Sequence, residues 1–366
     1  MILFLFLFLL STFLFKLTSY VDSQSRDNPY MTRLSFVPLS PVTITSDLSS
    51  PSLFFEFIGL HKPLIKRVVE DRVKDGSPKP AGFVFDMFCT TLADVANELG
   101  VPSYVFLTSG ANFLNFVFYV LSLADDYGLG ARDIAAKFSD SEFESLVSGF
   151  KNPLPSKFIP GVFKESGIDM LLNLARQFKK TKGILVNTYA EFESFAIQAL
   201  HNSDDKRVPP IYPVGPILEL KRDSEADSEE KRSITKWLDG QPVSSVVFLC
   251  FGSMGNLDEE QVKVIANGLD KSGVRFLWAL RKPPSVVNLG VPGDNEMYLD
   301  VLPESFLNYT INKGKIIEWA PQVNVLAHPA MGGFVSHCGW NSILESLWFG
   351  VPIGAWPMYA AKFKRV

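Results

Sequence analysis

Short runs of β-branched and aromatic residues alternate with helical patterns along most of this chain, and this alternation restricts the fold more than any other feature. In the first half, strand-like runs occupy 82–86, 103–107 and 183–187, and a helical pattern follows each of them. Short strands that alternate with helices are typical of mainly parallel sheets covered by helices. The sequence therefore predicts an α/β fold.

The alternation stops at a break in composition and then starts again. Four prolines between 209 and 216 lead into the charged segment LKRDSEADSEEKRS at 220–233, which is typical of a surface linker. Strand-like runs resume at 245–253, 275–280, 315–319 and 332–337, with helical patterns over 258–271 and 340–349. Two α/β units joined by a linker are expected to bind a ligand between them, at the carboxyl ends of their strands.

The charge balance makes some classes of partner poor candidates. The 366 residues include 35 lysines and arginines against 39 acidic residues, so the chain has no electrostatic footprint for nucleic acid or an anionic membrane. Small neutral ligands are expected instead, and the protein is expected to be a monomer. The three cysteines, Cys89, Cys250 and Cys338, have the spacing of neither a zinc site nor a disulfide framework, which favours a cytoplasmic location.

The N-terminal run ILFLFLFLLSTFLF at 2–15 leaves more than one interpretation open. It is similar to the core of a signal peptide, which would indicate a membrane-anchored or secreted protein. However, a spanning helix needs about 20 apolar residues, no basic residue precedes the run, and no cleavage pattern follows it. The alternatives are a buried strand or a wrongly assigned start.

The stretch over 319–362 has the pattern of a ligand site. A strand ends at His337, a tight turn follows, and a helix begins at Trp340, so that the positive helix end and its N–H groups face the strand terminus. Such an end binds phosphate, and the side chains of His337, Asn341 and Ser342 can donate to it.

The same stretch also offers groups for a nucleoside. Glu345 lies one helical turn beyond Asn341, where a carboxylate suits the vicinal hydroxyls of a ribose. Trp319 gives a flat surface for a base, and Gln322 gives an amide for a sugar. A single tryptophan or histidine at a strand end is usually a packing residue, but this combination at these spacings indicates a binding site.

These residues resemble the signature box of the plant secondary-product UDP-glycosyltransferases of family 1. Four other segments are similar to family sequence, namely LDGQPVSSVVFLCFGSMG at 238–255, RFLWALR at 275–281, GILVNTYAEFE at 183–193 and DMFCTTLADVANELGVPSYVFLTSG at 86–110. The resemblance covers about residues 16–359. It implies the GT-B fold, in which two Rossmann-like domains with mainly parallel sheets face each other across a cleft.

The resemblance also implies the domain boundaries. An acceptor-binding domain is expected over 16–219, with residues 1–15 in the place of its first strand and loop. A linker is expected over 220–236, and a UDP-sugar-binding domain over 237–366. Family members continue beyond the position of Val366, so the chain is expected to be truncated at both ends, with an incomplete C-terminal domain.

For the base and the ribose, the resemblance implies roles for four residues. Trp319 would stack on uracil, and backbone groups of Ala320 would bind the edge of the base. Gln322 and Glu345 would hold the ribose hydroxyls. These roles agree with the chemistry of the residues themselves.

For the diphosphate and the transferred sugar, the resemblance implies a site without a metal ion. UDP-sugar, with UDP-glucose expected, would be a co-substrate, and no acidic DxD motif lies between apolar strands. His337, Asn341 and Ser342 would bind the diphosphate together with Ser253. The residues beside the sugar would be Trp340 and Thr108.

The implied reaction is transfer of a hexose, with inversion, to a hydroxyl or carboxyl group of a small plant secondary metabolite or hormone. Such a transfer needs a base that removes the proton of the acceptor. Family members use a histidine near the N-terminus, oriented by an aspartate, and Asp86 matches the aspartate. The residue is also suited to be a helix N-cap.

Two departures from the family pattern leave an alternative open. None of the four histidines, His61, His201, His328 and His337, suits the role of the base. The acidic residue and the glutamine that would hold the sugar hydroxyls are replaced, at 361 and 362, by alanine and lysine. The alternative is therefore a catalytically inactive UDP-binding fragment, and the identities of the sugar and of the acceptor stay open.

Overall fold

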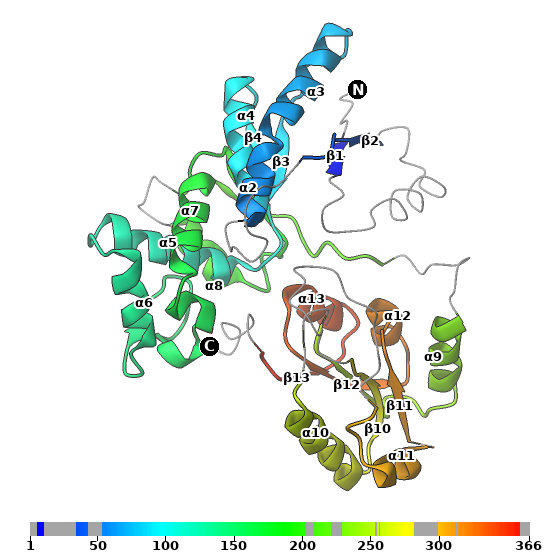
Figure 1. Ribbon diagram of the computed structural model, residues 1–366. Helices are drawn as coiled ribbons and strands as arrows, with labels where there is room; N and C mark the ends of the chain where they lie inside the picture. The colour runs from blue at the N-terminus through cyan, green and yellow to red at the C-terminus, as the bar shows by residue number, and fades with distance from the viewer. Residues whose placement is uncertain are drawn as a thin grey trace. The chain divides into compact units, whose positions relative to one another are not determined.

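The computed structural model describes residues 6–10, 34–42, 53–202, 208–220, 229–252, 255, 257–281, 299–311 and 313–358 (Figure 1). The chain consists of two compact units, the first mainly before and the second mainly after the junction of Gly215 and Pro216. The expected linker over 220–236 includes residues 221–228, which lie outside the described residues, and the first turns of a helix.

The first unit is built on a parallel sheet. Its strand order is β3-β4-β7-β8, and every neighbouring pair is parallel. The strands are β3 (Phe83–Asp86), β4 (Ser103–Leu107), β7 (Gly183–Val186) and β8 (Ile211–Pro213). The three strands predicted in the first half are thereby confirmed.

Helices fill the connections of this sheet. Between β3 and β4 the predicted helix is divided into a 3₁₀-helix, η2 (Met87–Leu92), and α4 (Ala93–Glu98). The predicted helix after β4 is α5 (Ala111–Asp125), which packs against α7 and α8. The other described α-helices of the unit are α2 (Leu53–Leu60), α3 (Lys62–Lys74), α6 (Ala131–Ser139), α7 (Ile168–Phe178) and α8 (Ser194–His201).

Part of the N-terminal apolar run forms a strand. β1 (Phe6–Leu10) pairs in parallel with β2 (Leu34–Pro38). A strand was one of the alternatives for the run at 2–15, and the described part of that run, residues 6–10, has strand structure. Across the part of the chain that the structure describes, no helix has both the length and the apolar character needed to cross a membrane.

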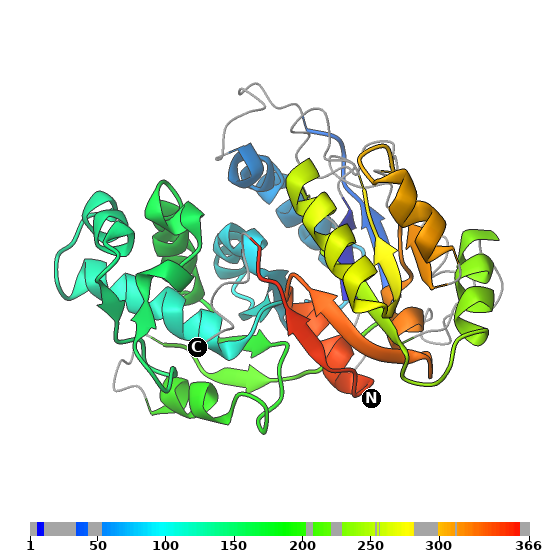
Figure 2. The same cartoon turned by 90° about the horizontal axis from the view of Figure 1, so that it is seen from below.

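The second unit contains a five-stranded parallel sheet with the order β11-β10-β9-β12-β13 (Figures 1 and 2). Its central strand is β9 (Val246–Cys250). The other strands are β10 (Arg275–Ala279), β11 (Gly314–Ile317), β12 (Met331–Ser336) and β13 (Ile353–Ala355). The four strands predicted in the second half are all present.

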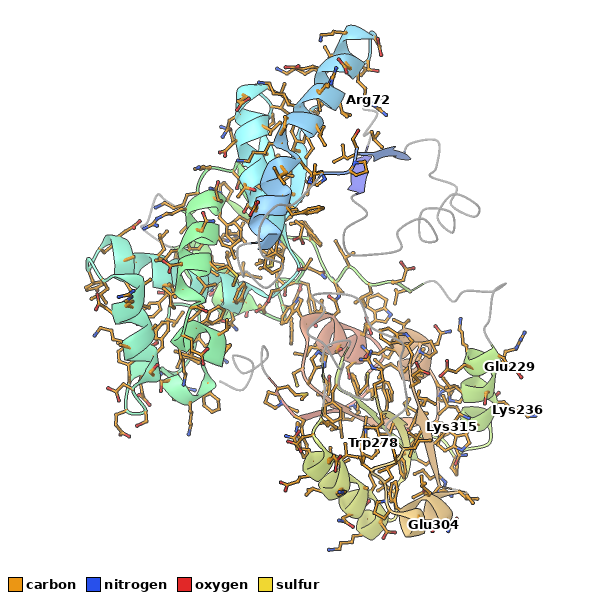
Figure 3. The ribbon with its side chains drawn as sticks, viewed as in Figure 1. Arg72, Glu229, Lys236, Trp278, Glu304 and Lys315 are labelled. Atoms are coloured by element: carbon orange, nitrogen blue, oxygen red, sulfur yellow. The ribbon has the colours of Figure 1, made fainter. Side chains whose placement is uncertain are left out.

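Helices cover both faces of this sheet, and strand β10 shows why. Phe276 and Trp278 pack with α10 (Glu259–Ser272) and α11 (Glu304–Thr310), whereas Leu277 packs with α9 (Glu229–Asp239) and α12 (Gln322–Leu326). Successive side chains of a strand point to opposite faces, so a strand buried on both faces is apolar throughout. Trp278, labelled in Figure 3, is fully buried.

Candidate functional site

The carboxyl ends of the strands of the second unit gather the predicted donor residues at one edge of the sheet. All five strands run in parallel, so the turns that follow them meet at the same edge. Gly252 follows β9, Arg281 follows β10, Trp319 follows β11 and His337 follows β12. The edge therefore brings together residues that are far apart in the sequence.

The imidazole of His337 lies between two glycines. Gly252 has a φ of 79°, and a β-carbon built on it would lie 2.6 Å from both Nε2 and Cε1 of His337. A β-carbon on Gly339 would lie 2.5 Å from the same Nε2. Both turns therefore need glycine to admit the ring, and they fix His337 at the start of the following helix.

That helix, α13 (Trp340–Trp348), has Gly339 as its N-cap and no side-chain cap. Its first backbone bond runs from the N–H of Ile343 to the carbonyl of Gly339, at 3.0 Å. The N–H groups of residues 340–342 precede this bond, in the first turn of the helix, where backbone donors are completed by groups outside the helix. Together with the helix dipole they form a positive end that suits an anion. Asn341 is exposed there, and Trp340 is half-buried.

A second cluster links α12 to α13. The side-chain amide of Gln322 donates to Glu345 Oε2 at 2.7 Å and to Ser342 Oγ at 3.0 Å. Burial raises the pKa of the Glu345 carboxyl, and the hydrogen bond from Gln322 lowers it in part. The structure thus brings together three of the predicted donor residues, although the sequence separates Gln322 from the other two by a strand.

Trp319 presents a half-exposed ring to which sequence reasoning gave no partner. The residue is 49% exposed, and the guanidinium carbon of Arg281 lies 5.1 Å from the ring centroid. Arg281 Nη2 also donates to the carbonyl of Gly252 at 2.6 Å. The segment RFLWALR contains this arginine, but nothing in its local pattern distinguishes it from a surface residue. Ala320, next to the tryptophan, is buried.

Three predicted positions of the second unit fall outside the described residues. They are Ser253, expected at the diphosphate, and the two departures from the family pattern, Ala361 and Lys362.

In the first unit, Asp86 ends strand β3 and is the N-cap of η2. Its carboxylate accepts a hydrogen bond from the N–H of Phe88 at 2.9 Å. Partial desolvation raises the pKa of this carboxyl, and hydrogen bonds from the backbone of Phe88 and Met87 lower it in part. Thr108 is exposed two residues beyond Phe106, the register partner of Asp86, and its hydroxyl lies 3.8 Å from Met87 Sδ.

No histidine is recorded against the Asp86 carboxylate in the described part of the chain. His61 Nδ1 lies 2.7 Å from the carbonyl of Phe57, His201 Nε2 lies 3.2 Å from that of Ile211, and His328 Nε2 lies 3.2 Å from Asp239 Oδ1. His337 belongs to the second unit. The described residues also contain no group of three or more histidine, cysteine and acidic side chains that could hold a metal ion.

Comparison with known proteins agrees with these features. The family described as UDP-glucoronosyl and UDP-glucosyl transferase matches residues 210–365. A UDP-glucose flavonoid 3-O-glucosyltransferase of Fragaria ananassa is 51% identical over 315 residues, which are 84% of this chain and 64% of that protein. An anthocyanidin 3-O-glucosyltransferase of Manihot esculenta is 50% identical over 274 residues, which are 75% of each chain.

A solved structure extends the likeness to the fold. The crystal structure of a UGT of Medicago truncatula complexed with UDP-glucose superposes with a TM-score of 0.81 and 38% identity, over 98% of this chain and 74% of the other. The predicted GT-B class, with α/β units built on parallel sheets, is confirmed by this likeness. The chain is a member of the plant family 1 UDP-glycosyltransferases, a family of glycosyltransferase enzymes.

Proposed function

We propose that this protein transfers glucose from UDP-glucose to a hydroxyl group of a flavonoid-like phenolic, with inversion at the anomeric carbon. The observation that carries the proposal is the contact of Gln322 with Ser342 and Glu345 beside the N-terminus of α13, which has glycine as its N-cap. The relatives are named as glucosyltransferases of flavonoids and anthocyanidins, and a solved relative was complexed with UDP-glucose. These names support the choice of donor and acceptor.

The base and the ribose would be bound by the residues that follow β11. The half-exposed ring of Trp319 provides a surface on which uracil can stack, and the backbone of Ala320 is next to it. Gln322 already holds Glu345 in place, and the ionised carboxylate can accept hydrogen bonds from two ribose hydroxyls. The cluster is thereby organised before the donor binds, which lowers the cost of ordering it.

The diphosphate would lie at the N-terminus of α13. The N–H groups of residues 340–342 and the side chains of His337, Asn341 and Ser342 offer donors to it, and Ser253 is proposed to add a hydroxyl. Negative charge grows on the diphosphate as the bond to glucose breaks, so these fixed donors stabilise the transition state more than the ground state. Trp340 and Thr108 are proposed to lie beside the sugar.

Asp86 is proposed to orient the base that removes the proton of the acceptor hydroxyl. A carboxylate held by its own backbone turn keeps one orientation, which suits a residue that steers another group. His61, His201 and His328 have contacts elsewhere in the structure, so none of them is assigned as the base.

The test is a pair of measurements on the chain as it stands. Calorimetric titration with UDP should give saturable binding, and incubation with UDP-glucose and a flavonol should give a monoglucoside detectable by mass spectrometry. UDP binding without any glucoside, across a panel of phenolic acceptors, would favour the alternative of an inactive UDP-binding protein. Absence of UDP binding by the folded chain would contradict the proposed donor site.

The expected location is the cytoplasm and the expected state is a monomer. A diffuse signal from a fluorescent fusion and a monomeric mass by light scattering would support these two proposals. Retention of the fusion in the secretory pathway would contradict the first of them.

A further inference from the structure

We infer that Arg281 is a positioning residue of the donor site, which holds the Trp319 ring and the Gly252 turn in the arrangement that UDP requires. This inference rests on the proposed function, because it assigns a role within the same site. It concerns a residue that neither the signature stretch nor the predicted roles include.

The register of the sheet explains why this arginine can contact both groups. In the pairing of β10 with β11, Ala279 is opposite Ile317, and continuing the register by two residues brings Arg281 opposite Trp319. In the pairing of β10 with β9, Trp278 is opposite Leu249, and continuing by three residues brings Arg281 opposite Gly252. Strand β10 lies between β9 and β11, so Arg281, in the extension of β10, lies beside both Gly252 and Trp319.

The contacts agree with this placement. The guanidinium carbon lies over the Trp319 ring at 5.1 Å, within the range of a cation–π interaction. At the same time Nη2 donates to the Gly252 carbonyl at 2.6 Å, which is a charge-assisted hydrogen bond. A planar guanidinium can stack and donate together, whereas the ammonium of a lysine cannot reproduce both contacts.

Both contacts lead to groups that the donor would touch. Trp319 remains 49% exposed with Arg281 over its ring, so surface is left for a base. The Gly252 turn packs against the imidazole of His337, beside the N-terminus of α13. Arg281 thus connects the platform proposed for uracil with the histidine proposed for the diphosphate, and it does so through its neighbours.

The experiment compares Arg281→Gln with Arg275→Gln in the full chain. Arg275 is exposed at the other end of the same strand, so both variants lose one positive charge from β10 or its extension. We expect Arg281→Gln to raise the dissociation constant for UDP about tenfold, and Arg275→Gln to leave it unchanged. Unchanged UDP binding by Arg281→Gln would overturn the inference.

A second variant separates positioning from charge. Arg281→Lys keeps the charge, and we expect it to lose most of the affinity that Arg281→Gln loses. Full recovery of UDP affinity in Arg281→Lys would overturn the inference, because charge alone would then be sufficient. In a Trp319→Phe background, Arg281→Gln should reduce the affinity for UDP by a smaller factor than it does in the unaltered chain, because the two residues act together. Fully additive losses would contradict this coupling.

A measurement on the ligand-free protein distinguishes a local change at Trp319 from a general loss of structure. The indole N–H resonance of Trp319, assigned with Trp319→Phe, should shift in Arg281→Gln and stay in place in Arg275→Gln. An unmoved resonance would overturn the positioning role. If the unaltered chain bound no UDP, the proposed function would fail and the role of Arg281 with it, whereas normal binding by Arg281→Gln removes only the role of Arg281.

Discussion

The donor residues of the second unit and the candidate catalytic residue of the first are held in place in different ways. In the second unit, Gln322 bonds to side chains of another helix, and His337 is enclosed by two glycines from separate turns. In the first unit, Asp86 bonds to the N–H of Phe88, two residues further along the same chain segment. One arrangement depends on the packing of distant segments and the other on a single local turn.

This difference predicts how each region responds to substitution. Where side chains hold one another, a small change of shape alters ligand binding and stability together. Where a side chain is held by its own turn, a substitution removes its chemistry and leaves the fold nearly unchanged.

Substitution of Asp86 by alanine should nearly abolish transfer while sparing the donor site. A positioned acid or base contributes about 10²- to 10⁴-fold to a rate, so kcat should fall by about that factor. The affinity for UDP should not change. Steady-state kinetics and UDP calorimetry on the same preparation measure both quantities.

Asp140→Ala is the matched control for this variant. Asp140 also accepts a backbone N–H two residues ahead, that of Glu142, at 3.0 Å. Both variants lose one hydrogen bond from a backbone N–H to a carboxylate two residues before it, which for the N-cap Asp86 is worth about 1 kcal/mol of stability, but only Asp86→Ala should lose activity. Equal turnover in the two variants would remove Asp86 from the mechanism.

Substitution of Gly252 by alanine should weaken UDP binding by about tenfold or more, by displacing His337 from the N-terminus of α13. Gly252 combines a φ of 79° with a β-carbon position 2.6 Å from the imidazole. Gly273→Ala provides the control, because Gly273 has a φ of 64° in the same unit and its β-carbon would meet nothing within 4 Å.

The two glycine variants should share the backbone strain of about 1–2 kcal/mol in their free energies of unfolding. Their difference in UDP affinity then isolates the contact with His337. Matching UDP affinities would show that this contact does not position the ring. Denaturant titration gives the free energy of unfolding of each variant, and calorimetry gives its affinity for UDP.

Substitution of Glu345 by glutamine should separate binding from stability within the donor cluster. An amide has one acceptor oxygen where the carboxylate has two, and its hydrogen bonds to the ribose hydroxyls lack the negative charge, so UDP affinity should fall about tenfold. The ligand-free melting temperature should stay the same or rise, because a partly buried charge is removed. Glu260→Gln, at an exposed position of α10, should change neither. A large loss of melting temperature in Glu345→Gln would contradict this account.

The elements that the sequence predicted well are those set by local patterns. The predicted strand 103–107 coincides with β4, whose side chains alternate between buried and half-buried. The predicted start of a helix at 258 is confirmed by a capping box, in which Asp258 and Gln261 exchange hydrogen bonds at 2.8 and 3.1 Å. Such signals need only a few neighbouring residues, so they can be read without knowledge of the fold.

The features that the sequence did not reveal depend on register between distant segments. Arg281 contacts Gly252 and Trp319, which lie 29 residues before it and 38 residues after it in the chain. The sequence of one strand does not specify which residues of the neighbouring strand will lie opposite it, because the register of the sheet is set by packing on both of its faces. The sequence did not reveal α9 for a related reason. Its first residues belong to the charged segment 220–233, and Ile234 and Leu238, which follow that segment, become core residues only where they pack against the sheet.

The smallest predicted effect is a pH dependence of stability that belongs to Glu345. Burial raises the pKa of this carboxyl in the folded state, so folding favours its protonated form. Its contribution to stability is therefore full below the ordinary glutamate range and is lost as the pH rises through the raised pKa. The free energy of unfolding of the unaltered chain should fall relative to that of Glu345→Gln over this interval, and the two should then run in parallel towards neutral pH. Denaturant titrations at closely spaced pH values measure the difference. A constant difference across the interval would show that the carboxyl is no harder to ionise in the folded protein, and that the donor cluster resembles the exposed turn at Asp140 more than a packed site.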